Sequence, residues 1–248
     1  MAKKIKDNYD EAFAQAFAAR IVVVLPGFAS GCFLRTLAGQ LDGKELFARL
    51  DLFALALARS LPGRYPQQIA ALHPLLGPEL PTEKGMYDTG GWLWPLARYV
   101  EKHGTEDFTV SMAFIRELTK RFTGEFAIRP LLAAFPAATM AEMVAWSRDD
   151  NVHIRRLASE GVRIRLPWAK KLTVALDRFD EYRTILARLK DDPSRFVQRS
   201  VGNNLNDLYK EAPALADGIV AQWEADGPLS EAARWTLRHG RRNLNRGG

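Results

Sequence analysis

Three acidic residues lie three or four positions from basic or amide residues, a spacing that places both partners on one face of a helix. The groups are Glu125 with Arg129, Glu160 with Arg156 and Arg163, and Asp207 with Asn203 and Arg199. Apolar residues surround each acid, so its charge requires a partner. Carboxylates held in this way can take part in catalysis. The same spacing also suits ion pairs and caps between helical repeats, and spacing alone does not separate the two interpretations.

Other kinds of reaction chemistry have little support in the sequence. It contains no Walker motif, dinucleotide fingerprint, HExxH pair or G-x-S-x-G elbow. Four His residues and a single cysteine, Cys32, are too few for a structural zinc site or an intramolecular disulfide. We therefore expect no structural zinc site and a reducing compartment.

The elements that must position these acids are predicted to be helices throughout. Apolar residues recur at three- and four-residue steps, whereas alternating strand-like runs are almost absent. Prolines fall at or near the expected breaks. The expected helices span about 8–23, 29–42, 44–60, 66–76, 91–103, 107–122, 125–135, 138–148, 151–163, 168–177, 180–190, 194–211, 214–226 and 230–244.

A weak internal repeat indicates how the helices are arranged. The run IRRLASEG at 154–161 aligns with VQRSVGNN at 197–204, and a fainter copy is ARWTLRHG at 233–240. The first offset is 43 residues, within the HEAT range. The sequence thus predicts an all-α, HEAT-like superhelix, an α-solenoid with a concave basic groove.

One irregular segment, 76–91, interrupts the helical pattern. We expect it to be a linker inside one domain that spans 1–248, because the part before it is short for an independent domain. On this interpretation 1–80 form an N-terminal helical bundle, and 91–248 form the repeat array with the active-site cleft.

The charge distribution favours a polyanionic partner. The chain of 248 residues has 35 Lys or Arg against 29 Asp or Glu, a net charge of +6. Residues 148–210 hold 14 basic and nine acidic side chains, and 234–246 add five Arg and no acid. A binding face for nucleic acid explains this concentration, and so does an ordinary solvated surface.

The sequence shows no targeting or membrane segment. Its first residues lack the apolar run of a signal peptide, and the apolar stretch 21–29 is too short for a membrane span and contains Pro26. We expect a cytoplasmic, monomeric protein with no membrane partner.

Six tryptophans could stack on bases or fill the core. The ambiguous ones are Trp92, Trp94, Trp146 and Trp168; Trp223 and Trp235 are expected in the core.

Three ordered runs resemble one known family. They are ELTKRFTGEFAIRPLL at 117–132, HIRRLASEGVRIRLPWAKKL at 153–172 and RFVQRSVGNNLNDLYKEAP at 195–213. They are similar to the AlkC family of bacterial alkylpurine DNA glycosylases, which belongs with AlkD to a HEAT-like superfamily. The resemblance is good from about residue 85 onward and fainter through LPGRYPQQIAALHPLLG at 61–77.

The resemblance implies a fold, an activity and a set of site residues. It implies a superhelix that grips duplex DNA containing alkylated bases at the nucleoid and removes 3-methyladenine, with 3-methylcytosine as a further substrate. It implies no metal and no organic cofactor. Its motifs imply Glu125, Glu160 and Asp207 as catalytic acids. They imply DNA contacts from Arg155, Arg156, Arg163, Trp168, Lys170, Lys171 and Arg199.

Two residues depart from the family pattern. Ile164 stands where proline is expected, and Gly202 where alanine is expected. Some members also carry a C-terminal immunoglobulin-like domain, which we expect to be absent here, with an effect on DNA engagement.

The implied chemistry suits the acids. Alkylation at N3 makes the base cationic and a good leaving group, so no general acid is needed. We expect Asp207 to position water and stabilise the sugar, and Glu160 and Glu125 to sense the positive lesion or share that task. Whether the base is flipped stays open. Two other functions also stay open: a non-catalytic HEAT-repeat DNA-binding protein and a protein-interaction scaffold.

Overall fold

The computed structural model describes residues 4–244, which form 14 α-helices and four 3-10 helices with no strand among them. The all-α prediction is confirmed. Residues 1–3 and 245–248, including Arg246 of the basic C-terminal stretch, lie outside the described residues. The chain divides into two compact units, a first unit of residues 1–130 and a second of 131–248. The single domain with a division near 80–91 stays a prediction.

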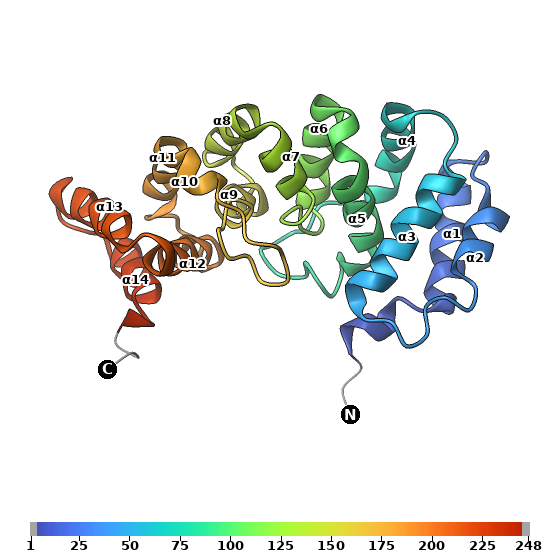
Figure 1. The fold of residues 1–248 in the computed structure, drawn as a ribbon, viewed down its shortest axis with the longest axis horizontal. Helices are drawn as coiled ribbons and strands as arrows, with labels where there is room; N and C mark the ends of the chain where they lie inside the picture. The colour runs from blue at the N-terminus through green and yellow to red at the C-terminus, as the bar shows by residue number, and fades with distance from the viewer. Residues whose placement is uncertain (1–3, 245–248) are drawn as a thin grey trace. The chain divides into compact units, whose positions relative to one another are not determined.

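The first unit is a set of helices (Figure 1), and aromatic side chains form its core. Phe17, Phe33 and Phe53 are almost completely buried and lie in mutual ring contact. Apolar rings from separate helices thereby join these helices into one core. The helices are α1 (Glu11–Val24), α2 (Ser30–Leu37), α3 (Leu46–Ser60), α4 (Tyr65–Leu72), α5 (Trp94–His103) and α6 (Phe108–Thr119), and α7 (Ile128–Ala134) begins at its end.

The irregular segment predicted at 76–91 lies inside the first unit and is fixed to the end of α6. The backbone N–H of Leu80 donates to the Lys120 carbonyl at 2.9 Å, and Arg121 Nε donates to the Gly77 carbonyl at 2.7 Å. Gly90 lies so close to this turn that a Cβ there would be 1.9 Å from the Arg121 carbonyl oxygen. The segment is therefore packed against the unit by backbone contacts that only glycine permits.

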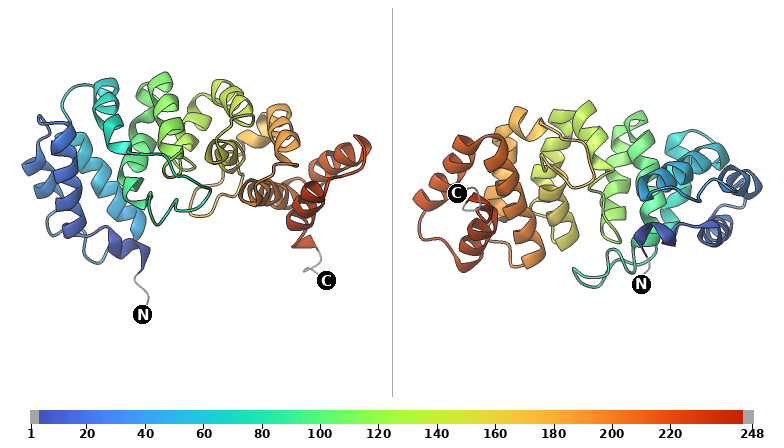
Figure 2. Two further views of the ribbon diagram at one scale, coloured as in Figure 1. Left: turned by 180° about the vertical axis from the view of Figure 1, so that it is seen from behind. Right: turned by 60° about the horizontal axis from the view of Figure 1, so that its bottom comes forward.

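The helices of the second unit follow one another in chain order from α8 to α14 (Figures 1 and 2). The helices α9, α12 and α14 contact one another in that order, and α8 packs on α11. Ile154, Val197 and Val201 are fully buried in this unit. The second unit comprises α8 (Pro136–Trp146), α9 (Val152–Glu160), α10 (Val174–Asp177), α11 (Phe179–Leu189), α12 (Arg195–Glu211), α13 (Pro213–Ala225) and α14 (Glu231–Gly240).

Local signals explain where these helices begin. Asn151, Ser194 and Ser230 cap α9, α12 and α14 by accepting a hydrogen bond from a backbone N–H of the first turn, at 2.9 to 3.1 Å. By contrast, α8 and α13 start with Pro136 and Pro213, whose fixed φ suits the first helical position. Two helices of this unit thus start with a proline and three with a side-chain cap. The 43-residue offset found in the sequence relates α9 to α12, and the fainter third copy corresponds to α14.

Two glycines allow α14 to pack closely against α12. A Cβ on Gly202 would lie 2.8 Å from His239 Cδ2 and 3.1 Å from the Thr236 carbonyl oxygen. A Cβ on Gly240 would lie 2.8 Å from Leu205 Cβ. The departure from the family pattern at Gly202 therefore has a steric reason in this chain: alanine would displace α14.

We expect Gly202→Ala to lower the free energy of unfolding by about 1–3 kcal/mol, the usual cost of overpacking a close interface. Chemical denaturation followed by circular dichroism measures it. Gly218→Ala is the matched control, because a Cβ on Gly218 of α13 meets nothing within 4 Å. An equal or smaller loss in Gly202→Ala would contradict a close approach of these helices.

The loop between α9 and α10 is longer than the sequence predicted. A helix was expected from about 168, but α10 begins only at Val174. Pro167 and the positive φ of 64° at Trp168 prevent helix there, and Leu172 N donates to the Ile164 carbonyl at 3.1 Å to close the loop. The prediction of helix over 168–173 is wrong for this reason. Ile164 itself is fully buried.

Within residues 4–244, every helix is too short or too polar to cross a bilayer.

Candidate active site in the second unit

Arg163 joins two of the predicted acids. It follows α9, and its Nη1 donates to Glu160 Oε1 at 2.9 Å. Its Nε donates to Asp207 Oδ2 at 3.0 Å and its Nη2 to Asp207 Oδ1 at 3.4 Å, which is a two-pronged contact with the last turns of α12. The three side chains are between 3% and 7% exposed. We call Glu160, Arg163 and Asp207 the acid cluster.

Glu160 is held in its charged form. Ser200 Oγ donates to Oε2 at 2.6 Å, and Arg156 Nη2 lies 3.5 Å from Oε1. Burial raises the pKa of Glu160, but the charges of Arg156 and Arg163 and the hydrogen bonds from Ser200 and Arg163 outweigh it and lower the pKa below its ordinary value of 4.5. Glu160 is therefore a carboxylate at neutral pH.

The two carboxylate oxygens of Asp207 differ in how many hydrogen bonds they accept. Its Oδ2 accepts from Arg163 Nε and, at 3.3 Å, from the backbone N–H of Arg165. Across residues 4–244, Oδ1 accepts only the long bond from Arg163 Nη2. Since a carboxylate oxygen can accept two hydrogen bonds, Oδ1 is the atom of the cluster with most capacity for a water molecule.

An amide fixes α9 against α12 beside the cluster. The fully buried Asn204 donates through Nδ2 to the Ser159 carbonyl at 2.8 Å and to the Ser200 carbonyl at 3.0 Å. Ser159 Oγ also donates to Ser200 Oγ at 2.7 Å. The two helices thus hold Glu160 and Asp207 in a fixed register.

The other basic residues predicted to bind DNA fall into two groups. Arg155 makes a two-pronged contact with the buried Asp192, at 2.7 and 3.4 Å, and donates to two carbonyls at the start of α9. Lys170, Lys171 and Arg199 are exposed. Lys171 pairs with Glu211, whereas the Arg199 side chain makes no hydrogen bond or ion pair with another part of the chain that the structure describes.

Trp168 lies at the surface of the loop that follows α9. Its side chain is 65% exposed, and its φ of 64° lies in the left-handed region that bulky residues rarely adopt. A large exposed aromatic ring held by a strained backbone is typical of a binding surface. By contrast, Trp94, Trp146 and Trp223 are buried.

Glu125 belongs to the first unit. It is 5% exposed, and Thr123 Oγ1 donates to its Oε2 at 3.0 Å. The helix expected from 125 begins only at Ile128, and Glu125 lies in the turn that leads into it, where the Ile128 N–H donates to the Gly124 carbonyl at 3.0 Å. That Glu125 acts together with the acid cluster stays a prediction.

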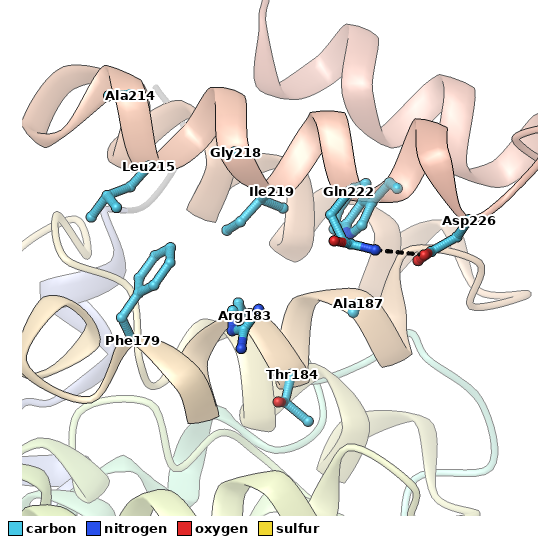
Figure 3. Close-up of a pocket in the computed structure, with 11 residues that line it drawn as sticks. Phe179, Arg183, Thr184, Ala187, Ala214, Leu215, Gly218, Ile219, Gln222 and Asp226 are labelled. Carbon is cyan, nitrogen blue, oxygen red and sulfur yellow. Dashed lines mark hydrogen bonds between the residues drawn. The ribbon is translucent and has the colours of Figure 1, made fainter.

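An apolar pocket of the second unit is separate from these residues. It has a volume of about 350 Å³ between α11 and α13 and is lined by Phe179, Leu215 and Ile219, among others (Figure 3). Its one carboxylate, Asp226, accepts a hydrogen bond from Gln222 at 2.7 Å. Neither Glu160 nor Asp207 lines it, so the candidate chemistry does not depend on this pocket. In residues 4–244 no three His, Cys, Asp or Glu side chains gather to hold a metal ion.

Two groups that complete the acid cluster were not predicted from the sequence, Ser200 and the backbone N–H of Arg165. Ser200 lies seven residues before Asp207, two helical turns away on the same face, and this spacing could have indicated it. No side-chain pattern could have indicated a backbone donor in a loop.

Comparisons with known proteins identify the family. The sequence profile of a family described as DNA alkylation repair enzyme matches residues 98–244. The uncharacterized protein YhaZ of Bacillus subtilis is 33% identical over 242 residues, which is 97% of this chain and 64% of that protein. The solved structure of Pseudomonas fluorescens alkylpurine DNA glycosylase AlkC, bound to DNA containing an abasic site analog, is also 33% identical. It matches with a TM-score of 0.85 over 98% of this chain and 65% of that one.

The structural match confirms the predicted HEAT-like helical-repeat fold. The chain spans just under two thirds of the length of both relatives. The family profile covers more than half of the chain, and the matched segment contains Glu125 and the whole acid cluster. This protein therefore belongs to the family of DNA alkylation repair enzymes.

Proposed function

We propose that this protein is a DNA glycosylase that hydrolyses the N-glycosidic bond of cationic alkylated bases in duplex DNA, with 3-methyladenine as its main substrate. The observation that carries the proposal is the acid cluster, in which one arginine binds two buried carboxylates. The cluster occurs in a chain that belongs to the family of DNA alkylation repair enzymes. A buried carboxylate kept charged by arginines suits a reaction in which positive charge develops on a sugar.

The reaction assigns a separate role to each carboxylate. The bond between C1′ and the base nitrogen breaks, and its electron pair neutralises the alkylated base. Asp207 stabilises the resulting oxocarbenium-like sugar and accepts a hydrogen bond from the attacking water through Oδ1. The oxygen of that water bonds to C1′, and its proton leaves to a carboxylate or to solvent. Glu160 adds negative charge that favours a cationic base.

Surface residues of the second unit would hold the duplex. We assign phosphate contacts to the exposed Arg199, Lys170 and Lys171, and a stacking contact to Trp168. Arg156 and Arg163 would line the cleft and keep Glu160 ionised. Arg155 stays a predicted DNA contact, although its bonds to Asp192 favour a structural role. We assign this activity to the cytoplasm at the nucleoid, because the proposed substrate is DNA.

Base release from methylated duplex DNA tests the proposal. The purified chain is incubated with methylated DNA, and chromatography compares released 3-methyladenine, 7-methylguanine and 3-methylcytosine. We expect enzyme-dependent release of 3-methyladenine above the others. Salt-dependent DNA binding without any release would favour a non-catalytic DNA-binding protein. Weak binding that does not depend on salt would favour a scaffold, because phosphate contacts make affinity fall steeply with salt.

A further inference from the structure

A cluster of polar and basic side chains lies one helical turn along α12 from Asp207. Asn203, four residues before Asp207, is half-buried. His239 Nε2 from α14 lies 3.0 Å from its Oδ1, and Arg242 Nη2 donates to the same oxygen at 3.0 Å. Arg199, four residues before Asn203, shares its helix face. None of these four side chains belongs to the acid cluster.

The contacts fix which way the Asn203 amide faces. A guanidinium can only donate, so the atom that meets Arg242 must be the amide oxygen. His239 Nε2 meets this same oxygen and must therefore carry the imidazole proton. The Asn203 Nδ2 group, with two N–H donors, has no hydrogen-bond partner in the portion of the chain described by the structure.

Neighbouring rings hold His239 in place. Its imidazole stacks on Trp235 at 5.0 Å between centroids with 7° between planes, and Arg195 Cζ lies 4.1 Å from the centre of that indole. Trp235 is half-buried, not in the core as the sequence suggested. Gly202 leaves the space that the imidazole fills.

The charge around Asn203 is strongly positive. Burial, together with the guanidiniums of Arg242, Arg199 and Arg163, lowers the pKa of His239 to about 4. A surface depression of about 410 Å³ beside Arg242 is lined by Arg234, Leu237, Arg238 and Arg241, without an acidic side chain. An amide with two available donors in such surroundings suits a singly charged anion such as a phosphodiester.

We propose that Asn203, Arg242 and Arg199, with His239 as a positioning residue, form a subsite for one DNA backbone phosphate beside the reacting nucleotide. This proposal rests on the proposed function, because that function supplies the duplex. Asn203 donates to a phosphate oxygen through Nδ2, the two arginines supply charge, and His239 keeps the amide oriented. The subsite fixes where α12, and with it Asp207, meets the sugar.

Binding of an unmodified duplex tests the subsite without any chemistry. Fluorescence anisotropy over a series of salt concentrations compares the wild type with Asn203→Ala and Arg242→Met. We expect about tenfold weaker binding for Asn203→Ala with an unchanged salt slope, since it removes a hydrogen bond but no charge. For Arg242→Met we expect weaker binding and a salt slope shallower by about 0.9, because one phosphate contact is lost.

Two further variants separate the subsite from general charge and from folding. Arg183→Met on α11 removes an exposed arginine that pairs with Asp180, and we expect wild-type binding from it. His239→Gln keeps a side-chain donor for Asn203 Oδ1, so it should bind more tightly than His239→Leu. Thermal melting of each variant excludes unfolding as the cause.

The pKa of His239 distinguishes a phosphate subsite from a purely structural role of these residues, because a structural role predicts no change of this pKa when DNA binds. A bound phosphate offsets the neighbouring guanidiniums, so duplex DNA should raise this pKa above about 4, as measured by NMR titration. Wild-type affinity in both Asn203→Ala and Arg242→Met, or a His239 pKa unchanged by DNA, would overturn the subsite. If those variants lose affinity but the wild type releases no base, the glycosylase activity fails and the subsite stands.

Discussion

Asp207→Asn is expected to slow release of 3-methyladenine from methylated duplex DNA by about 10²–10³-fold, with duplex affinity close to that of the wild type. Asparagine keeps the size of the side chain and one oxygen for Arg163, but it removes the negative charge that stabilises the sugar and orients water. Single-turnover release measured by chromatography gives the rate, and anisotropy gives the affinity.

The matched control is Glu211→Gln, which removes one carboxylate charge from the same helix one turn further on. Glu211 pairs with Arg165 and Lys171, outside the acid cluster. We expect its release rate to stay within a few-fold of the wild type. A rate for Asp207→Asn equal to that of Glu211→Gln would remove Asp207 from the mechanism.

Arg163→Met is expected to lower the free energy of unfolding by about 3–5 kcal/mol near neutral pH, because it leaves two buried carboxylates without their shared partner. Methionine fills a similar volume, so the loss reports charge more than packing. Urea denaturation followed by circular dichroism measures it. Arg165→Met is the control: its side chain is 51% exposed, and we expect a change of about 0–1 kcal/mol.

The pH dependence of stability that Glu160 contributes should weaken in the Arg163→Met variant. In the wild type the folded pKa of Glu160 lies below its ordinary 4.5, so its contribution is present above that value and is lost as the pH falls through the folded pKa. Arg163→Met removes one of the charges and one of the hydrogen bonds that lower this pKa, while Arg156 and Ser200 remain, so the folded pKa should rise and less stability should be lost on acidification. Denaturation across the acidic range and at pH 7.5 compares the two proteins; an equal loss on acidification in both would show that Arg163 does not help to set the charge of Glu160.

Much of the fold could be predicted from sequence because its signals are local. Apolar spacing indicated the helices, Asn151 and Ser194 mark two helix starts, and the 43-residue offset indicated neighbouring repeats. The prediction failed at 168–173, where Pro167 and the strained Trp168 end any helix, because the extent of a loop depends on how its ends pack.

The site could be predicted only in part, for a related reason. The spacing of Arg156, Glu160 and Arg163 places these charges together within a few residues, and their contacts are confirmed. The same spacing argument paired Glu125 with Arg129, and this pair stays a prediction; α7 itself begins only at Ile128. Arg163 lies just beyond the end of α9, so spacing can place residues together a short way past a helix end as well as within it.

The sequence by itself determined the helical elements, their repeat and which acidic residues have an arginine three or four positions away. Only the tertiary structure decided that Arg163 forms an ion pair with Asp207, 44 residues away, and that His239 orients Asn203, 36 residues away. A helix repeats every 3.6 residues and fixes neighbours along itself, but it does not fix the register of the next helix. That register depends on close contacts such as those at Gly202 and Gly240, which exist only once α12 and α14 have packed.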